Sequence, residues 1–180
     1  MKPWKTLARE TILDQGKYLV VENHTIELPD GRILPNWAWL ITPAYINAMV
    51  LTDDDHFLCF RQTKYGIAGT SLAPLGGYLE PGEEPLACAQ RELLEEMGCV
   101  ADEWIKLGTY CVDGNRGAGT AHLFFARGAR RVQAPDADDL EEQELVRLTR
   151  VQVSNALARG DFRVLAWAAV AALTLACVNP

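Results

Sequence analysis

Residues 76–100 contain a dense group of acidic side chains that could bind a divalent metal ion. Glu92, Glu95 and Glu96 are spaced three and four residues apart, so a helix would bring their carboxylates to one face. Like charges at this spacing repel each other by roughly 0.2–0.5 kcal/mol per pair, and a bound cation would offset that repulsion. Hard carboxylate oxygens are the ligands that Mg²⁺ and Mn²⁺ prefer. The pattern would therefore suit a site for Mg²⁺ or Mn²⁺.

Other residues nearby would complete such a site. Glu83 stands where the chain enters the helix and could fold back toward the other carboxylates. Arg91 offers a planar fork of N–H donors that could hold one carboxylate in place, and Gly76 and Gly77 allow the backbone to pass close to a ligand. The alternative is a solvated helix face, on which Arg91 and Glu95 form an ordinary i, i+4 ion pair.

The elements around this group are predicted from apolar spacing and from turn residues. A helix is expected over residues 85–97, because Pro85 suits a first helical turn and Gly98 suits a C-terminal stop. A shorter helix and a buried last helix are expected over residues 151–160 and 164–178. Strands are expected over residues 17–34 as a pair, and over 37–42, 45–52, 56–62, 104–112 and 120–128. This order predicts an α/β sandwich with mixed sheets.

Composition narrows the class of protein. The chain has 180 residues, which fits one domain. Its net charge of −7 disfavours a nucleic-acid partner. The five cysteines form no C-x-x-C and no signal peptide is evident, so a reduced, cytoplasmic protein is expected. The most apolar run, residues 164–178, is too short for a membrane span, and no membrane association is expected.

The spacing of the acidic segment resembles the Nudix box, written G-x5-E-x7-R-E-U-x-E-E-x-G-U with U aliphatic. The matching residues are Gly77, Glu83, Arg91, Glu92, Leu93, Glu95, Glu96 and Gly98, and Cys99 replaces the last aliphatic residue. The resemblance implies the Nudix α/β/α sandwich, with mixed β-sheets and the box as a loop-helix-loop. It also implies metal-dependent hydrolysis of a nucleoside diphosphate linked to another group X.

The resemblance implies a role for each residue of the box. Glu92, Glu95 and Glu96 become metal ligands, with the backbone carbonyl of Leu75 as a further candidate. Glu95, Arg91 and Glu83 become catalytic or orienting residues. Gly76 and Gly77 become part of the substrate site.

A second resemblance narrows the substrate. The segment Arg61-Gln62-x-Lys64 and the run Pro74-Leu75-Gly76-Gly77 resemble the R-Q-x-R and L-P-A-G-G motifs of the ADP-ribose and ADP-sugar pyrophosphatases, with Lys64 and Leu75 as replacements. This similarity implies an ADP-sugar-like substrate, cleaved to a nucleoside monophosphate and a sugar phosphate. It implies an N-terminal β-rich arm over residues 1–45 that supports a homodimer, and a core over residues 46–180.

The substrate-site residues outside the box have competing interpretations. Arg61 could contact substrate phosphate or could be a surface charge. Trp39 could stack on a nucleobase or pack in the core or at a dimer interface. The acidic stretch 136–144 is either a solvated loop or, as in the resembling branch, the source of a general base. Its candidates are Glu141, Glu142 and Glu144, of which we take Glu142 as the representative.

Three other functions stay open from the sequence. One is pyrophosphohydrolysis of nucleoside triphosphates. Another is an isomerase similar to isopentenyl-diphosphate isomerase, which the cysteines would suit. The third is a ligand sensor without catalysis, which is disfavoured because no basic helix-turn-helix is evident.

Overall fold

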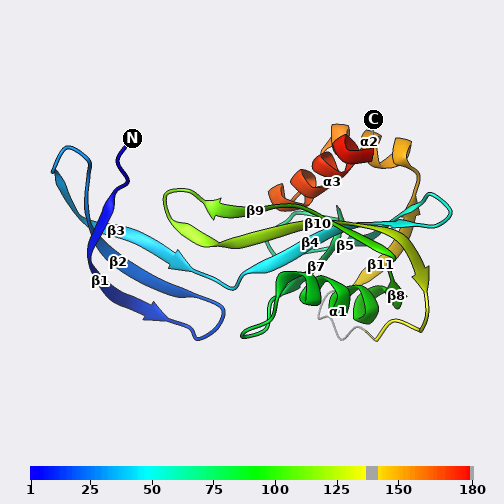
Figure 1. Ribbon diagram of the computed structural model, residues 1–180, viewed down its shortest axis with the longest axis horizontal. Coiled ribbons are helices and arrows are strands. Elements are labelled where there is room, and N and C mark those ends of the chain that lie inside the picture. The colour runs from blue at the N-terminus through cyan, green and yellow to red at the C-terminus, as the bar shows by residue number, and fades with distance from the viewer. Residues whose placement is uncertain (137–141, 179–180) are drawn as a thin grey trace. The chain divides into compact units, whose positions relative to one another are not determined.

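The computed structural model describes residues 1–136 and 142–178 (Figure 1). These residues form two compact units. The first unit consists of residues 1–44 and 110–120, and the second of residues 45–109 and the described residues from 121 onward. Two strands, β9 (Glu103–Asp113) and β10 (Gly117–Arg131), contribute residues to both units.

The first unit is an antiparallel meander of three strands, β1 (Lys5–Asp14), β2 (Val20–Glu27) and β3 (Ile33–Ile41). The turn between β2 and β3 contains Gly31 with a φ of 85°, a conformation that glycine adopts without strain. The predicted pair of strands around this turn is confirmed. The first strand, β1, was not predicted, because all of its residues are exposed and they give no burial alternation.

The second unit contains a mixed sheet with the strand order β10, β4 (Tyr45–Thr52), β5 (Phe57–Gln62) and β11 (Gln143–Leu148). Strand β4 runs parallel to β10 and antiparallel to β5, and β5 runs antiparallel to β11. The short strand β8 (Cys99–Val100) pairs with β10. Residues from β4, β5 and β10 supply much of the buried apolar core.

Two short strands link the middle of this sheet to the acidic segment. Strand β6 (Ser71–Ala73) pairs with β5, whereas β7 (Leu75–Tyr78) pairs with β4. Pro74 separates them, and proline has no backbone N–H to donate to a ladder. The chain therefore changes its pairing partner at the residue that lacks a donor, two positions before Gly76.

Helices cover both faces of the sheet in the second unit. Helix α1 (Pro85–Met97) packs against β4 and β7 on one face. Helices α2 (Arg150–Arg159) and α3 (Leu165–Val178) pack against each other on the opposite side, where α3 contacts β4 (Figure 1). The predicted α/β/α sandwich with mixed strands is confirmed. Among the described residues, no helix has both the length and the apolar character needed to cross a membrane.

Strand register assigns side chains to the two faces of this sheet, since directly paired residues point the same way and successive residues alternate. Ile46 pairs with Gly77, and a Cβ added to Gly77 would lie 2.2 Å from the carboxylate of Glu92 on α1. Ile46 and Gly77 therefore face α1. Asn47, the next residue on β4, faces the side of α2 and α3.

Candidate active site

Helix α1 begins and ends at the residues that the sequence predicts. Pro85 occupies the first turn, where its missing N–H costs no hydrogen bond. Gly98 ends the helix in the left-handed conformation with a φ of 64°, and its N–H donates to the carbonyls of Leu93 and Leu94. The residues buried against the sheet are Cys88, Ala89, Leu93 and Met97. Burial of this stripe places the arginine and the glutamates of the helix away from the core.

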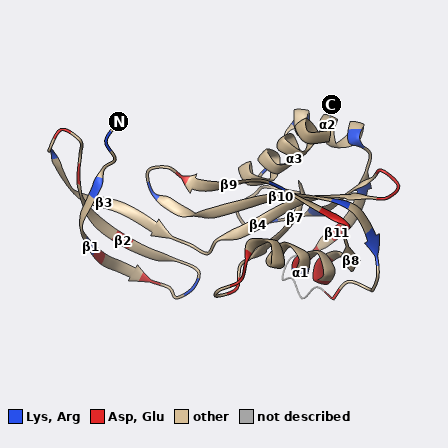
Figure 2. Ribbon diagram, viewed as in Figure 1, with Lys and Arg blue, Asp and Glu red and all other residues tan. Residues whose placement is uncertain are grey.

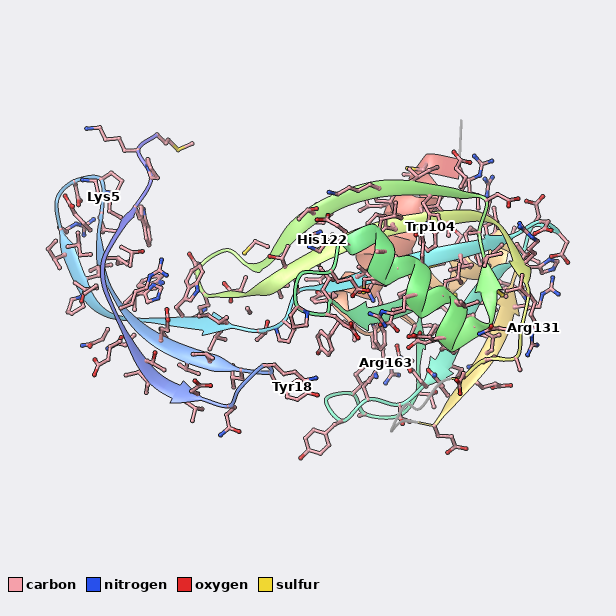
Figure 3. All side chains as sticks on the ribbon, turned by 60° about the horizontal axis from the view of Figure 1, so that its bottom comes forward. Lys5, Tyr18, Trp104, His122, Arg131 and Arg163 are labelled. Atoms are coloured by element: carbon pink, nitrogen blue, oxygen red, sulfur yellow. The ribbon has the colours of Figure 1, made fainter. Side chains whose placement is uncertain are left out.

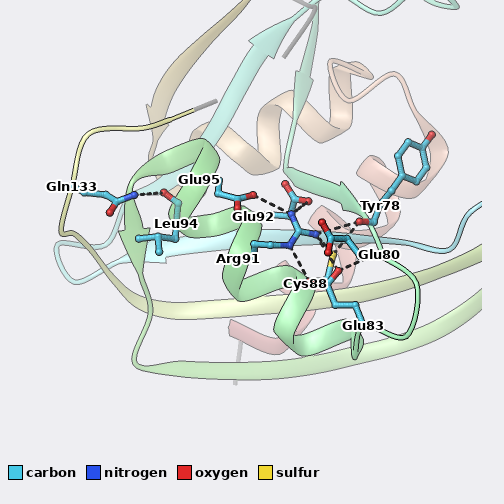
Figure 4. Close-up of polar contacts among 9 residues, drawn as sticks. All are labelled: Tyr78, Glu80, Glu83, Cys88, Arg91, Glu92, Leu94, Glu95 and Gln133. Carbon is cyan, nitrogen blue, oxygen red and sulfur yellow. Dashed lines mark hydrogen bonds and ion pairs between the residues drawn. The ribbon is translucent and has the colours of Figure 1, made fainter. Parts of the chain in front are cut away.

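Arg91 connects the helix to the loop that precedes it. Its Nε donates to Oε1 of Glu83 at 2.9 Å, and its Nη2 donates to Oε2 of the same carboxylate at 3.1 Å (Figure 4). The backbone N–H of Glu80 also donates to Oε2 of Glu83, at 2.9 Å. Both oxygens of Glu83 are thus engaged in holding the loop to the helix.

The same guanidinium also binds two glutamates of α1. Arg91 Nη1 donates to Glu92 Oε1 at 2.7 Å and to Glu95 Oε2 at 3.0 Å. We call Arg91, Glu83, Glu92 and Glu95 the Arg91 cluster. Acidic side chains gather on α1 and on the loop before it, as Figure 2 shows. One guanidinium therefore contacts three carboxylates and offsets part of the repulsion that the sequence implies, while the cluster keeps a net negative charge.

Two further partners of Arg91 were not predicted from the sequence. Its Nη2 lies 3.3 Å from the carbonyl oxygen of Tyr78 and 3.4 Å from the sulfur of Cys88. The Cys88 thiol in turn donates to the Tyr78 carbonyl at 3.5 Å. The end of β7 and the first turn of α1 therefore supply a polar rim around the guanidinium. The sequence does not reveal the Tyr78 carbonyl as a partner, because every residue has a backbone carbonyl. It does not reveal the Cys88 thiol either, because a cysteine at this position of the helix could equally be an apolar core residue.

The electrostatics of the cluster follow from these contacts. Hydrogen bonds from Arg91 lower the pKa of Glu83 to about 2, so this carboxylate is ionised across the physiological range. Hydrogen bonding and proximity to the glutamates raise the pKa of Arg91 above its usual value. Burial, together with the negative charges of Glu83 and Glu92, raises the pKa of the Cys88 thiol to about 12. Cys88 is accordingly a neutral thiol near pH 7 and a weak acid.

Gly76 and Gly77, at the start of the box, make room for the side chains around them. A Cβ on Gly76 would lie 2.7 Å from Nδ2 of Asn47, and one on Gly77 would lie 2.2 Å from the Glu92 carboxylate. Asn47 is buried, and its Nδ2 donates to the carbonyl of Leu75 at 3.3 Å. That bond fixes the carbonyl that the Nudix resemblance marks as a ligand. The close approach of Glu92 to Gly77 requires a residue without a side chain.

The residues of the box fit a divalent cation by chemistry. Glu92, Glu95 and Glu96 offer hard carboxylate oxygens from one helix face, and the space at Gly77 admits the Glu92 carboxylate. In the part of the chain that the structure describes, no three His, Cys, Asp or Glu side chains already converge as a ligand set. Glu92 and Glu95 are turned to Arg91 instead. A cation would therefore share these two carboxylates with the guanidinium.

Register places Arg61 on the opposite face of the sheet from α1. Leu51 of β4 pairs with Phe57 of β5, and Arg61 follows Phe57 by four residues, so both share the face of Asn47. The Arg61 side chain lies 3.8 Å from the carboxylate of Glu144, its cross-strand neighbour on β11. The structure does not bring Arg61 or Glu144 together with the Arg91 cluster.

The other residues of the predicted substrate site lie in different settings. Trp39 belongs to the first unit, where its ring stacks on His24 with centroids 5.5 Å apart. Glu142 is exposed, and Glu141 lies outside the described residues. The first residue of this stretch contacts α1, because the N–H of Asp136 donates to the carbonyl of Glu95 at 2.8 Å. The acidic stretch therefore begins beside the helix that carries the box.

Comparison with known proteins gives the class that this fold and site define. The NUDIX domain model matches residues 42–168, more than half of the chain, so the chain belongs to the Nudix family and is a Nudix hydrolase. It is similar to the ADP-ribose pyrophosphatase of Bacillus subtilis (strain 168), with 28% identity over 85% of this chain and 80% of that protein. It is also similar to the methanol dehydrogenase activator of Bacillus methanolicus, with 26% identity over 85% of this chain and 80% of that protein.

A solved structure supports the fold independently. The crystal structure of an ADP compounds hydrolase superposes with a TM-score of 0.82 at 20% sequence identity, and the match covers 99% of this chain and 96% of that one. At this identity the likeness bears on the fold alone.

Proposed function

We propose that this Nudix hydrolase cleaves the pyrophosphate bond of a nucleoside diphosphate linked to a sugar, with an ADP-ribose-like substrate and Mg²⁺ or Mn²⁺ as the cofactor. The observation that carries the proposal is the Arg91 cluster, in which one guanidinium orients the carboxylates of an intact box. The name of the related ADP-ribose pyrophosphatase supports the substrate class. The products would be a nucleoside monophosphate and a sugar phosphate.

Each residue of the box has a separate proposed role. Glu92, Glu95 and Glu96 would hold the cation with the Leu75 carbonyl, and a bound cation would supply Lewis-acid stabilisation of the phosphoryl oxygens. Glu83 holds Arg91, and Arg91 orients Glu92 and Glu95. The Glu95 side chain is 49% exposed, against 14% for Glu83 and 12% for Glu92. Glu95 is therefore the carboxylate of the cluster best placed to accept a proton from an attacking water, with Glu142 as the candidate from the downstream stretch.

A panel of substrates tests this proposal. The panel holds ADP-ribose, ADP-glucose, UDP-glucose, NADH, diadenosine polyphosphates and nucleoside triphosphates, each with Mg²⁺ and with Mn²⁺, and products are separated by chromatography. We expect AMP and ribose 5-phosphate from ADP-ribose. Preferential release of pyrophosphate from a triphosphate would show that the substrates are nucleoside triphosphates and not nucleoside diphosphate sugars. Absence of metal-dependent cleavage across the panel would overturn the proposal in favour of an isomerase or a ligand sensor.

We also propose that the first unit serves as the arm of a homodimer. It exposes large apolar side chains on its strands, among them Leu7, Ile12 and Ile33, and exposed apolar patches mark interaction surfaces. Light scattering should give twice the chain mass, and Leu7→Asp with Ile12→Asp should give a monomer. A monomeric unmodified protein would contradict this assignment.

We also propose a cytoplasmic location. All five cysteines are free, which supports a reducing compartment such as the cytoplasm.

A further inference from the structure

A second polar cleft lies in the same unit as the Arg91 cluster but on the other face of the sheet. Its volume is about 410 Å³, and its walls come from β5, β6, the end of β11, α2 and the segment that follows α2. We call it the α2 cleft. Arg61 and Leu72 form a strand pair in its wall, and Arg61 faces away from α1, as its register shows. The α2 cleft is therefore separate from the site of the Nudix box.

Positive charge dominates the lining of the α2 cleft. Arg61, Arg159 and Arg163 contribute three guanidinium groups, and Asp161 contributes the single carboxylate of the lining. Glu144 pairs with Arg61 from outside the lining, at 3.8 Å. This concentration is unusual for a chain whose net charge is −7. A local excess of arginine inside a concave surface attracts anions and raises their local concentration.

The arginines are held at the wall by contacts that leave donors for a ligand. Arg159 donates to one oxygen of Asp161 through Nε at 3.2 Å and through Nη2 at 2.7 Å. Arg163 (labelled in Figure 3) donates from Nη1 to the Ala68 carbonyl, and its backbone N–H donates to the Ser71 hydroxyl. A guanidinium carries five N–H donors. The contacts above occupy two of them on Arg159 and one on Arg163, whereas Nε of Arg61 lies 3.8 Å from the Glu144 carboxylate, beyond hydrogen-bond distance. The remaining donors suit the oxygens of a phosphate group.

Helix α2 adds neutral donors and sets the size of the ligand. Gln152 and Asn155 line the cleft, and the Oε1 atom of Gln152 accepts from the backbone N–H of Thr149 in the capping box of α2, which leaves its Nε2 group as the donor. A volume of about 410 Å³ falls in the lower part of the range for small-molecule sites, which is about 300–1,000 Å³. The cleft therefore admits inorganic phosphate or a sugar phosphate more readily than an intact dinucleotide.

We propose that the α2 cleft is an anion site that binds the phosphate group of a small phosphate compound, with Arg159, Arg163 and Arg61 as the charged donors. This inference does not depend on the hydrolytic activity, because the two sites share no side chain. The ligand chemistry is that of a phosphate dianion or monoester. Its source is either free inorganic phosphate or the phosphate of a small sugar ester.

Chemical-shift titration of the metal-free ¹⁵N-labelled protein tests the site at residue level. Inorganic phosphate and ribose 5-phosphate are titrated separately in EDTA at constant ionic strength. We expect saturable shifts of the backbone amides of Ser71, Leu72 and Arg163. Tighter binding of inorganic phosphate would identify the free ion as the ligand, and tighter binding of ribose 5-phosphate would identify the ester; either supports the site.

The variant Arg159→Gln should weaken binding about tenfold, which corresponds to the loss of one charge-assisted hydrogen bond. Arg32→Gln is the matched control, because Arg32 also pairs with an aspartate two residues away, Asp30, but does not line the cleft. Arg61→Gln provides a second variant that keeps the Arg159–Asp161 contact.

Three results would overturn the proposal: no saturable shifts in the cleft, shifts confined to residues 76–98, or equal weakening by Arg159→Gln and Arg32→Gln. None of these measurements involves substrate turnover. A failure of the anion site is therefore distinguishable from a failure of the proposed hydrolysis.

Discussion

The guanidinium of Arg91 binds both carboxylate oxygens of Glu83, a residue of the preceding loop eight positions earlier, at 2.9 and 3.1 Å. The same group reaches Glu92 and Glu95 on its own helix. One side chain therefore sets the relative positions of the loop and of two carboxylates proposed to hold the cation. Its planar geometry is what allows contacts in several directions at once.

Arg91→Lys should lower kcat by about 100-fold, because a single ammonium group cannot keep three carboxylates in place and small displacements of reacting groups are costly. Steady-state kinetics with ADP-ribose measure this effect, and circular dichroism checks the fold. Arg130→Lys is the control, since Arg130 pairs with Asp102 outside the cluster. Equal effects of the two variants would remove the special role of Arg91.

Glu96→Gln should reduce turnover by orders of magnitude while the fold stays intact, because it removes one anionic ligand from the proposed cation site. Manganese binding, followed by electron paramagnetic resonance, should weaken in parallel. Glu84→Gln is the control: Glu84 stands at the N-cap of α1, and its side chain makes no capping hydrogen bond there. Unchanged activity and Mn²⁺ affinity in Glu96→Gln would refute the metal-site assignment.

Gly77→Ala should impair catalysis more than stability, because the new Cβ would lie 2.2 Å from the Glu92 carboxylate and displace it. We expect a loss of kcat of about tenfold or more, since the carboxylate must leave its position. Gly66→Ala gives a matched comparison, as nothing lies within 4 Å of a Cβ there. Steady-state kinetics of both variants measure the effect on catalysis, and thermal denaturation measures the effect on stability. Similar kcat values for Gly77→Ala and Gly66→Ala would argue against close packing at Gly77.

The Glu83–Arg91 pair predicts a specific pH dependence of stability. Because the pKa of Glu83 falls from 4.5 to about 2 on folding, its contribution to the free energy of unfolding is fully present above about pH 4.5. That contribution is lost as the pH falls toward 2, where the folded-state carboxylate takes up a proton. Urea denaturation at several pH values, compared between the unmodified protein and Glu83→Gln, measures it. A difference that does not shrink below pH 4.5 would contradict the assignment.

Much of the box was predictable because its signals are local. Pro85 and Gly98 define the helix ends, and the apolar residues of α1 fix which side faces the sheet. The association of Arg91 with the glutamates was predicted from residue types and spacing. The Tyr78 carbonyl was not, since the position of a backbone group depends on the path of β7 relative to α1.

The face of the sheet on which Arg61 lies could not be predicted from the local sequence. A strand residue can face either side of a sheet, and the alternation within β5 does not say which side α1 covers. The side follows only from the pairing of β5 with β4 and from the contact between Glu92 and Gly77. The α2 cleft has no local signal for the same reason, because its arginines come from β5, from the end of α2 and from the segment after α2, and Arg61 is far from the other two in the sequence.

The change of pairing partner at Pro74 makes the length of one short segment critical. Ser71 and Leu72 contribute to the α2 cleft, and residues 75–78 lead into the Nudix box, within one extended run. Inserting or deleting a single residue in this run would exchange the faces of every residue beyond it, and Gly77 would no longer lie under Glu92. The number of residues between 71 and 78 is therefore constrained by both sites at once.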